Sequence, residues 1–123
     1  MVAREGFGYL GQALSAAEIF AALYLDALTP DDDLVVSPGH YAIVHYAAGV
    51  EIGRIDPAEL VTYGVDGSRL ESIGTEGTPG LTATCGSLGQ GLSVAAGLAV
   101  GARLNGSAKR VYAVVREGEM EEG

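Results

Sequence analysis

The sequence predicts an α/β fold with three layers, αβα, in which helices cover both faces of a mostly parallel sheet. Two apolar runs rich in β-branched residues, 34–37 and 111–115, predict the strands. The second run is apolar on both faces, which favours the middle of a parallel sheet. Between the strands, three glycines at 86–91 lead straight into a helical pattern. Two strands make only part of such a sheet, so we expect an incomplete fold over residues 1–123, with an open edge that pairs with another chain.

The composition is that of one globular domain or part of one, with 123 residues of which 48% are hydrophobic. A net charge of −9, from sixteen acidic and seven basic residues, opposes nucleic-acid binding. We also expect no membrane contact, because no basic amphipathic segment is present. The single cysteine, Cys85, excludes an internal disulfide and agrees with a cytoplasmic location. No base stands beside it in the sequence, so we expect a buried, unreactive thiol.

The N-terminal third predicts a helix that ends in a turn. Ser15 and Glu18 have the spacing of a capping box at a helix start. A helical stripe of apolar residues follows, consisting of Ile19, Phe20, Leu23, Tyr24 and Leu28. Pro30 and the aspartates at 31–33 then end the helix. A solvated turn is expected there, since the alternative of a metal site has no visible partner residues.

The central part predicts an α/β unit followed by a long loop. Residues 38–39, Pro-Gly, break the first strand, and apolar residues predict a helix over 41–50. Ligands often bind at such strand–turn–helix junctions. The Asp-Pro pair at 56–57 predicts the capped start of a short helix over 58–63. Residues 64–83 are rich in Gly, Ser and Thr and predict a long loop, of the kind that often carries function.

The stretch 84–106 predicts a glycine-rich turn followed by a helix. Apolar residues at three- and four-residue steps predict a buried helix face, namely Leu88, Leu92, Ala95, Leu98 and Ala102. Gly97 and Gly101 lie one helical turn apart and would let another element pack closely. Two interpretations are open from composition alone: a tightly packed internal helix, or a turn that offers bare backbone to a cofactor.

Three segments are expected to meet at the carboxyl ends of the strands, where open α/β sheets bind ligands. They are the turn 37–40, the turn 86–91 and the acidic end 116–123. His40 lies in the first turn and titrates near neutrality, which suits proton transfer. His45 lies off the same helical face, and we expect it to be structural.

Four segments resemble the N-terminal part of transketolase, the domain that binds the diphosphate of thiamine diphosphate. They are LGQALSAAEIFAALY, LVVSPGHYAIVHYA, TPGLTATCGSLGQGLSVAAGLAVGARL and the terminal REGEMEEG. The third is very specific, because it follows the family pattern Thr-Gly-Ser-Leu-Gly-Gln-Gly-Leu-Ser. The resemblance covers nearly the whole chain and implies a thiamine-diphosphate-binding fold, with residues 1–123 as the N-terminal part of the diphosphate-binding domain.

The resemblance also implies an activity and partners. Transketolases transfer a two-carbon ketol unit between sugar phosphates, using thiamine diphosphate and Mg2+ or Ca2+. They form dimers with cofactor sites at the subunit interface. The expected partner is therefore a second copy or a complementing transketolase chain with the pyrimidine-binding domain. That domain and the family's asparagine metal ligand are expected beyond residue 123, so the chain alone is not expected to complete the active site.

Carried over by position, the resemblance assigns His40 a catalytic role near the cofactor and the substrate. Gly86 and Leu88 would hold the aminopyrimidine ring through backbone and apolar contact. These three residues form the part of the expected site that precedes the acidic end.

At the acidic end, Gly118 and Glu119 would lie under the diphosphate, because amides at a helix start favour an anion. Glu117 would bind the divalent ion, which prefers oxygen ligands. Glu122 would correspond to a family glutamate at the contact between subunits.

Several positions depart from the family pattern. Tyr9 stands where the family has a histidine, segment 67–74 lacks another, and Cys85 replaces threonine or a similar small residue. Tyr9 is expected to be structural. Glu117 replaces the metal-binding aspartate, and Arg116 replaces the glycine before it, although its guanidinium could itself pair with a phosphate. Two functions remain open: the catalytic N-terminal part of a transketolase, and a non-catalytic transketolase-like interaction module without turnover.

Overall fold

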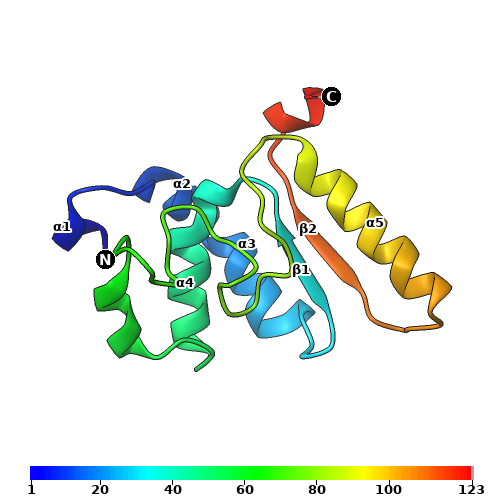
Figure 1. The fold of residues 1–123 in the computed structure, drawn as a ribbon, viewed down its shortest axis with the longest axis horizontal. Coiled ribbons are helices and arrows are strands. Elements are labelled where there is room, and N and C mark those ends of the chain that lie inside the picture. The colour runs from blue at the N-terminus through cyan, green and yellow to red at the C-terminus, as the bar shows by residue number, and fades with distance from the viewer. Residues whose placement is uncertain (123) are drawn as a thin grey trace.

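Helices alternate with two strands in the computed structural model, which describes residues 1–122 (Figure 1). The α-helices are α1 (Val2–Glu5), α2 (Leu10–Ser15), α3 (Ala17–Ala22), α4 (Ala42–Glu51) and α5 (Gln90–Leu104). Shorter helical turns are η1 (Leu23–Ala27), η2 (Gly39–Tyr41), η3 (Pro57–Thr62) and η4 (Gly118–Glu121), and the strands are β1 (Asp33–Val36) and β2 (Val111–Val114). Within these described residues, every helix is too short or too polar to cross a membrane.

The two strands pair in parallel, and both predicted strands are confirmed. The register runs from Asp33 opposite Val111 to Val36 opposite Val114. The ladder continues past the strand ends, because the Ser37 N–H donates to the Val114 carbonyl oxygen at 3.0 Å. The turns that follow both strands therefore start at the same edge of the sheet.

Helices cover both faces of β1 and so create three layers. Leu34 and Val36 belong to the main hydrophobic core, which they share with α2, α3 and α4. Val35 points to the opposite face and packs with Cys85 and with Ala95 of α5. Figure 1 shows the same order, with α3 and α4 on one side of the strands and α5 on the other. The structure is an incomplete α/β fold around a small parallel sheet.

Both strands are edge strands in this two-stranded sheet, so the expected central position of β2 stays a prediction. Tyr112 is half-buried and Ala113 is exposed. The far edge of β1 is partly covered by Thr82, whose N–H donates to the Leu34 carbonyl at 2.9 Å and whose Oγ1 accepts from the Leu34 N–H at 3.1 Å. The outer edge of β2 has no such cover among residues 1–122.

The expected turn forms at residues 30–31 with Asp31 exposed, whereas Asp32 and Asp33 join the two strands. The Asp32 carboxylate accepts from the backbone N–H groups of Arg110 at 2.8 Å and Thr29 at 3.0 Å, and from the Arg110 guanidinium at 3.0 Å. The hydrogen bond from the Arg110 backbone, followed by that from Thr29, holds the pKa of Asp32 well below its usual range. Asp33 forms an ion pair with Lys109. Residues from the segment before β2 thus fix this turn.

The predicted helix start at Ser15 is wrong, because α2 ends there. The Ser15 hydroxyl donates back to the Gln12 carbonyl at 2.9 Å, and α3 begins without a side-chain cap. The helix then ends in the π-helical turn η1. Within the predicted apolar stripe, Phe20 and Tyr24 are buried, but Ile19 is 54% exposed.

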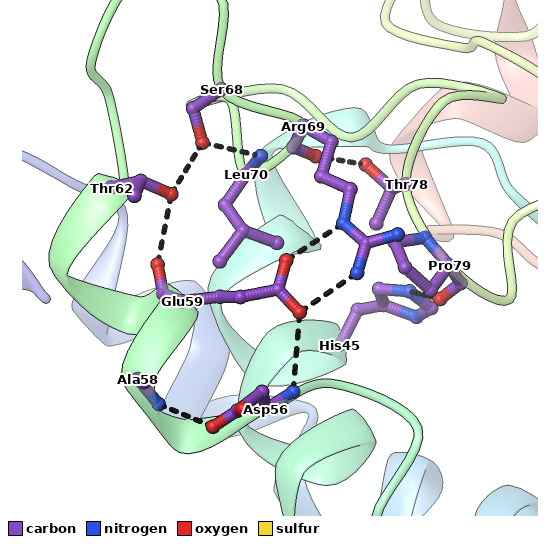
Figure 2. A network of polar contacts seen from close by, with 10 residues as sticks. All are labelled: His45, Asp56, Ala58, Glu59, Thr62, Ser68, Arg69, Leu70, Thr78 and Pro79. Atoms are coloured by element: carbon purple, nitrogen blue, oxygen red, sulfur yellow. Dashed lines mark hydrogen bonds and ion pairs between the residues drawn. The ribbon is translucent and has the colours of Figure 1, made fainter.

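The predicted cap at Asp56 is confirmed, although η3 is a 3-10 helix. Asp56 Oδ1 accepts from the Ala58 N–H at 2.8 Å, and the Asp56 N–H donates to Glu59 Oε1 at 3.3 Å (Figure 2). Glu59 also pairs with both sides of the Arg69 guanidinium, with two N···O distances of 2.7 Å. This pair ties η3 to the loop that follows.

The predicted long loop is confirmed and is well anchored. Residues 63–89 contain no regular helix or strand. The Thr78 hydroxyl donates to the Arg69 carbonyl at 2.8 Å, and the Tyr46 hydroxyl donates to the Glu71 carbonyl at 2.6 Å. The loop therefore packs on α4 and reaches the site with a fixed backbone.

α5 lies on the outside of the described residues, which do not pack it as the internal helix of the first interpretation. Its buried residues are Gly91, Ala95 and Ala102. Leu92 is 42% exposed, and Leu88 before the helix is 39% exposed. A Cβ atom on Gly97 or Gly101 would meet no atom of residues 1–122 within 4 Å, so this chain does not use the predicted close approach.

Candidate functional site

Three segments that are far apart in the sequence meet at the carboxyl ends of β1 and β2, as predicted. They are the turn 37–40, the turn 86–91 and the segment 116–122. Ser37 Oγ accepts a hydrogen bond from the Gly91 N–H at 3.2 Å. A Cβ atom on Gly89 would lie 2.8 Å from the Glu122 carbonyl oxygen, so the end of the described chain rests on the glycine-rich turn.

Two of the glycines at this junction are needed for the protein's own packing. A Cβ atom on Gly39 would clash with the Cys85 carbonyl oxygen, and one on Gly91 would clash with the Ser37 side chain. The bare backbone at these two positions lets the first two turns touch. It is therefore not evidence for a ligand.

Three predicted site residues at the same junction are exposed to solvent and are not used for packing between the turns. Gly86 and Gly118 are exposed, and a Cβ atom on Gly118 would meet nothing within 4 Å among the described residues. Leu88 is partly exposed beside Gly86 in the sequence. These positions, in contrast to Gly39 and Gly91, can offer backbone and apolar surface to a ligand.

His40 lies between a cation and a carboxylate. Arg116 Nη1 donates to His40 Nε2 at 3.1 Å, so the other ring nitrogen, Nδ1, carries the proton of the neutral imidazole. Burial and then the Arg116 charge lower the pKa of His40, and the Glu119 charge opposes them. Tyr9 packs against the ring with 5.3 Å between centroids. His40 is therefore a neutral imidazole near pH 7.

The glutamates at the end of the chain lie in different environments. Glu119 is 3% exposed, and neither of its carboxylate oxygens has a hydrogen-bond partner among residues 1–122. Burying a carboxylate without a partner is costly, so this side chain marks a place where a hydrogen-bond donor is required. Glu117, by contrast, is exposed just before η4, and Glu122 is exposed on the glycine-rich turn.

The described residues form no complete site for the expected divalent ion. No group of three or more His, Cys, Asp or Glu side chains within residues 1–122 could hold a metal. Glu117 is exposed to solvent, and the orphaned carboxylate is that of Glu119. The role of Glu117 as a metal ligand therefore stays a prediction.

No protein-family model matches the chain. It is 43% identical to a transketolase family protein of Sinorhizobium fredii, over 97% of this chain and 46% of that protein. It is 36% identical to an apulose-4-phosphate transketolase subunit from Actinobacillus succinogenes, over 94% and 46% of the two chains. A third relative, 6-deoxy-6-sulfo-D-fructose transketolase subunit SqwG of a Clostridium species, is 33% identical over 99% and 48%.

The chain is transketolase-like over nearly its whole length. It spans about half the length of these curated relatives. Two of the three relatives are named as transketolase subunits. Their names are consistent with enzymes assembled from complementing chains.

One departure from the family pattern lies beside a predicted site residue. Tyr9, predicted to be structural, is 46% exposed and lies against His40. A partial signal is present in the sequence, because Tyr9 stands where the family has a histidine. Its neighbour in space comes from a turn far along the chain, and only the fold shows that contact.

Cys85 and His45 agree with their expected structural roles. Cys85 is buried, and burial together with the Glu119 charge raises the pKa of its thiol, which makes it a poor nucleophile. His45 is fully buried with both ring nitrogens paired, to Tyr24 at 2.6 Å and to the Pro79 carbonyl at 3.1 Å. Neither residue faces an open surface.

Proposed function

We propose that this chain is the N-terminal part of a transketolase that transfers a two-carbon ketol unit between sugar phosphates with thiamine diphosphate. The observation that carries the proposal is the meeting of the SPGH turn, the GSLGQG turn and the terminal segment at one edge of the parallel sheet, with His40, Gly86 and Glu119 among them. Ligands of open α/β sheets bind at this edge.

The open residues can bind and orient the cofactor. The backbone at Gly86 and the apolar side chain of Leu88 would contact the aminopyrimidine ring, and the backbone at Gly118 would lie under the diphosphate. Thiamine diphosphate, when bound, supplies the stabilisation of a carbanion. His40 would hold a proton at Nδ1 and exchange it with the sugar substrate, which suits a neutral imidazole near pH 7.

A partner is part of the proposal. The pyrimidine-binding domain would come from a complementing chain or from a second copy, with Glu122 at the contact between subunits. The exposed position of Glu122 and the uncovered edge of β2 support such a contact. A cytoplasmic location would suit this metabolic role.

A non-catalytic interaction module is the second candidate. The departures from the family pattern favour it, because Tyr9 replaces a histidine and Glu117 replaces the metal-binding aspartate. Such a module would retain the fold and the subunit contact without turnover.

Thermal unfolding with thiamine diphosphate tests the proposed function. A hundredfold excess over the dissociation constant should raise the melting temperature by roughly 10 °C, while thiamine without the diphosphate should have a much smaller effect. Gly86→Leu should abolish the shift, because the added side chain occupies the ring-binding surface.

Gly77→Leu is the matched control, since the same side chain is added at another exposed loop glycine, where a Cβ atom would meet only Thr75 Oγ1 at 3.4 Å. Stabilisation by the cofactor that is unaffected by Gly86→Leu would argue against the site. No stabilisation, together with binding to a complementing transketolase chain, would support the interaction module instead.

A further inference from the structure

Arg116 is a cation without a carboxylate partner among residues 1–122, although it lies in a strongly acidic segment. Four glutamates lie within six positions of it, at 117, 119, 121 and 122. The ion pairs within residues 1–122 include none between these glutamates and Arg116, whose hydrogen bond goes to His40. The guanidinium is exposed, so its remaining N–H groups are available to a ligand.

The two groups that lie near Arg116 have opposite effects on an anion: His40 favours its binding and Glu119 opposes it. His40 accepts a hydrogen bond from it and carries its own proton on Nδ1, so the pair can offer N–H donors from both residues. Glu119 acts from the buried side and would repel an anion. A neutral imidazole alone does not offset that repulsion, so the guanidinium is the group that makes anion binding favourable here.

The usual counter-charge for a diphosphate does not assemble among the described residues. Glu117 is exposed, and no group of three metal-ligating side chains forms within residues 1–122. A guanidinium can pair with two phosphate oxygens at once and remains charged at any accessible pH. Its fork of N–H groups can therefore supply both a charge and a geometry that suit a phosphate group.

We propose that Arg116, together with His40, binds the phosphate or diphosphate group of the ligand directly, so that binding requires no divalent cation. The inference rests on the proposed function for the identity of the cofactor and adds how its negative charge is balanced. It makes Arg116 the specificity-determining residue for an anionic ligand in this chain.

Calorimetric titration with inorganic pyrophosphate in the presence of EDTA tests the inference apart from the proposed function. Pyrophosphate should bind the wild-type chain without metal, and Arg116→Gln should weaken binding at least tenfold. In parallel, the side-chain Nε–H resonance of Arg116 should shift on addition of pyrophosphate, which reports binding without any assay of activity.

Arg103→Gln is the matched control, because Arg103 is exposed in the last turn of α5 and its loss changes the net charge equally. It should leave pyrophosphate binding unchanged.

The outcomes separate the two proposals. Pyrophosphate binding that requires Mg2+ in the wild type, or that Arg116→Gln and Arg103→Gln affect equally, overturns the inference and leaves the proposed function standing. Binding through Arg116 with no preference for thiamine diphosphate supports the inference and contradicts the proposed function. Absence of binding for both ligands, with and without Mg2+, overturns both.

Discussion

His45 is a buried histidine whose two hydrogen bonds define its protonation. Its Nε2 faces the Pro79 carbonyl, which only accepts, so this nitrogen carries the proton. Nδ1 must then accept from the Tyr24 hydroxyl. Burial lowers the pKa of His45 to about 4, against the opposing effect of the hydrogen bond to Pro79. The imidazole joins α4, the turn η1 and the long loop as a neutral group.

The free energy of unfolding should therefore fall when the pH is lowered. In the unfolded chain His45 titrates near 6.5, whereas in the folded chain it titrates near 4. Between these values the unfolded state binds more protons, so stability is complete above about pH 6.5 and decreases down to about pH 4. The loss should reach roughly 3 kcal/mol. Urea unfolding at several pH values measures it.

His45→Gln is the informative variant, because glutamine can still donate to the Pro79 carbonyl but does not titrate. It should flatten most of the pH dependence between pH 4 and 6.5. His40→Gln is the control, and it should remove only a small part, since His40 is far less buried. An unchanged slope in His45→Gln would show that another group is responsible.

At the scale of single elements, a capping pattern predicted a helix start correctly only where the side chain made no competing hydrogen bond to the preceding turn. At Asp56, a proline follows at once and Glu59 folds back, so the cap forms as predicted. At Ser15, the same kind of spacing misled, because the hydroxyl donates back to the preceding turn and ends α2. A capping pattern cannot distinguish a helix start from a helix end when both are possible.

The cap on η3 should be measurable as a stability change. Asp56→Ala removes the acceptor for the Ala58 N–H and should cost about 1 kcal/mol of unfolding free energy. Asp31→Ala, in an exposed turn, should cost less than about 0.5 kcal/mol. Chemical denaturation of both variants provides the comparison. Equal effects of the two substitutions would mean that the capping box does not stabilise η3.

Sequence patterns predicted the secondary-structure elements and their topology better than the tertiary contacts between them. The two strands, the parallel direction, the long loop and the meeting of three turns at one edge of the sheet were all predictable, because each depends on local runs and on α/β topology. The exposure of α5 among the described residues was not, because periodicity does not show what covers a helix face. Likewise, the contact of Tyr9 with His40 and the orphaned Glu119 depend on the tertiary packing.

The face of α5 that residues 1–122 leave exposed should bring two copies of this chain together. Val94 and Val100 are exposed on this helix, and Gly97 and Gly101 lie between Val94 and Arg103 without contacts to other elements of residues 1–122. Arg103 is the only charged residue of α5, so two copies can meet there without bringing together the acidic groups that give the chain its charge of −9. The small residues allow close approach of helices, and the exposed apolar area favours burial.

Sedimentation velocity at rising protein concentration should therefore show a dimer at micromolar concentrations. Val100→Glu should weaken it at least tenfold, because a charge would be buried at the contact. Val61→Glu is the control, since Val61 is exposed to a similar degree, 59% against 58%, but lies on η3. A chain that stays monomeric, or that responds equally to both substitutions, would argue against α5 as a contact between two copies.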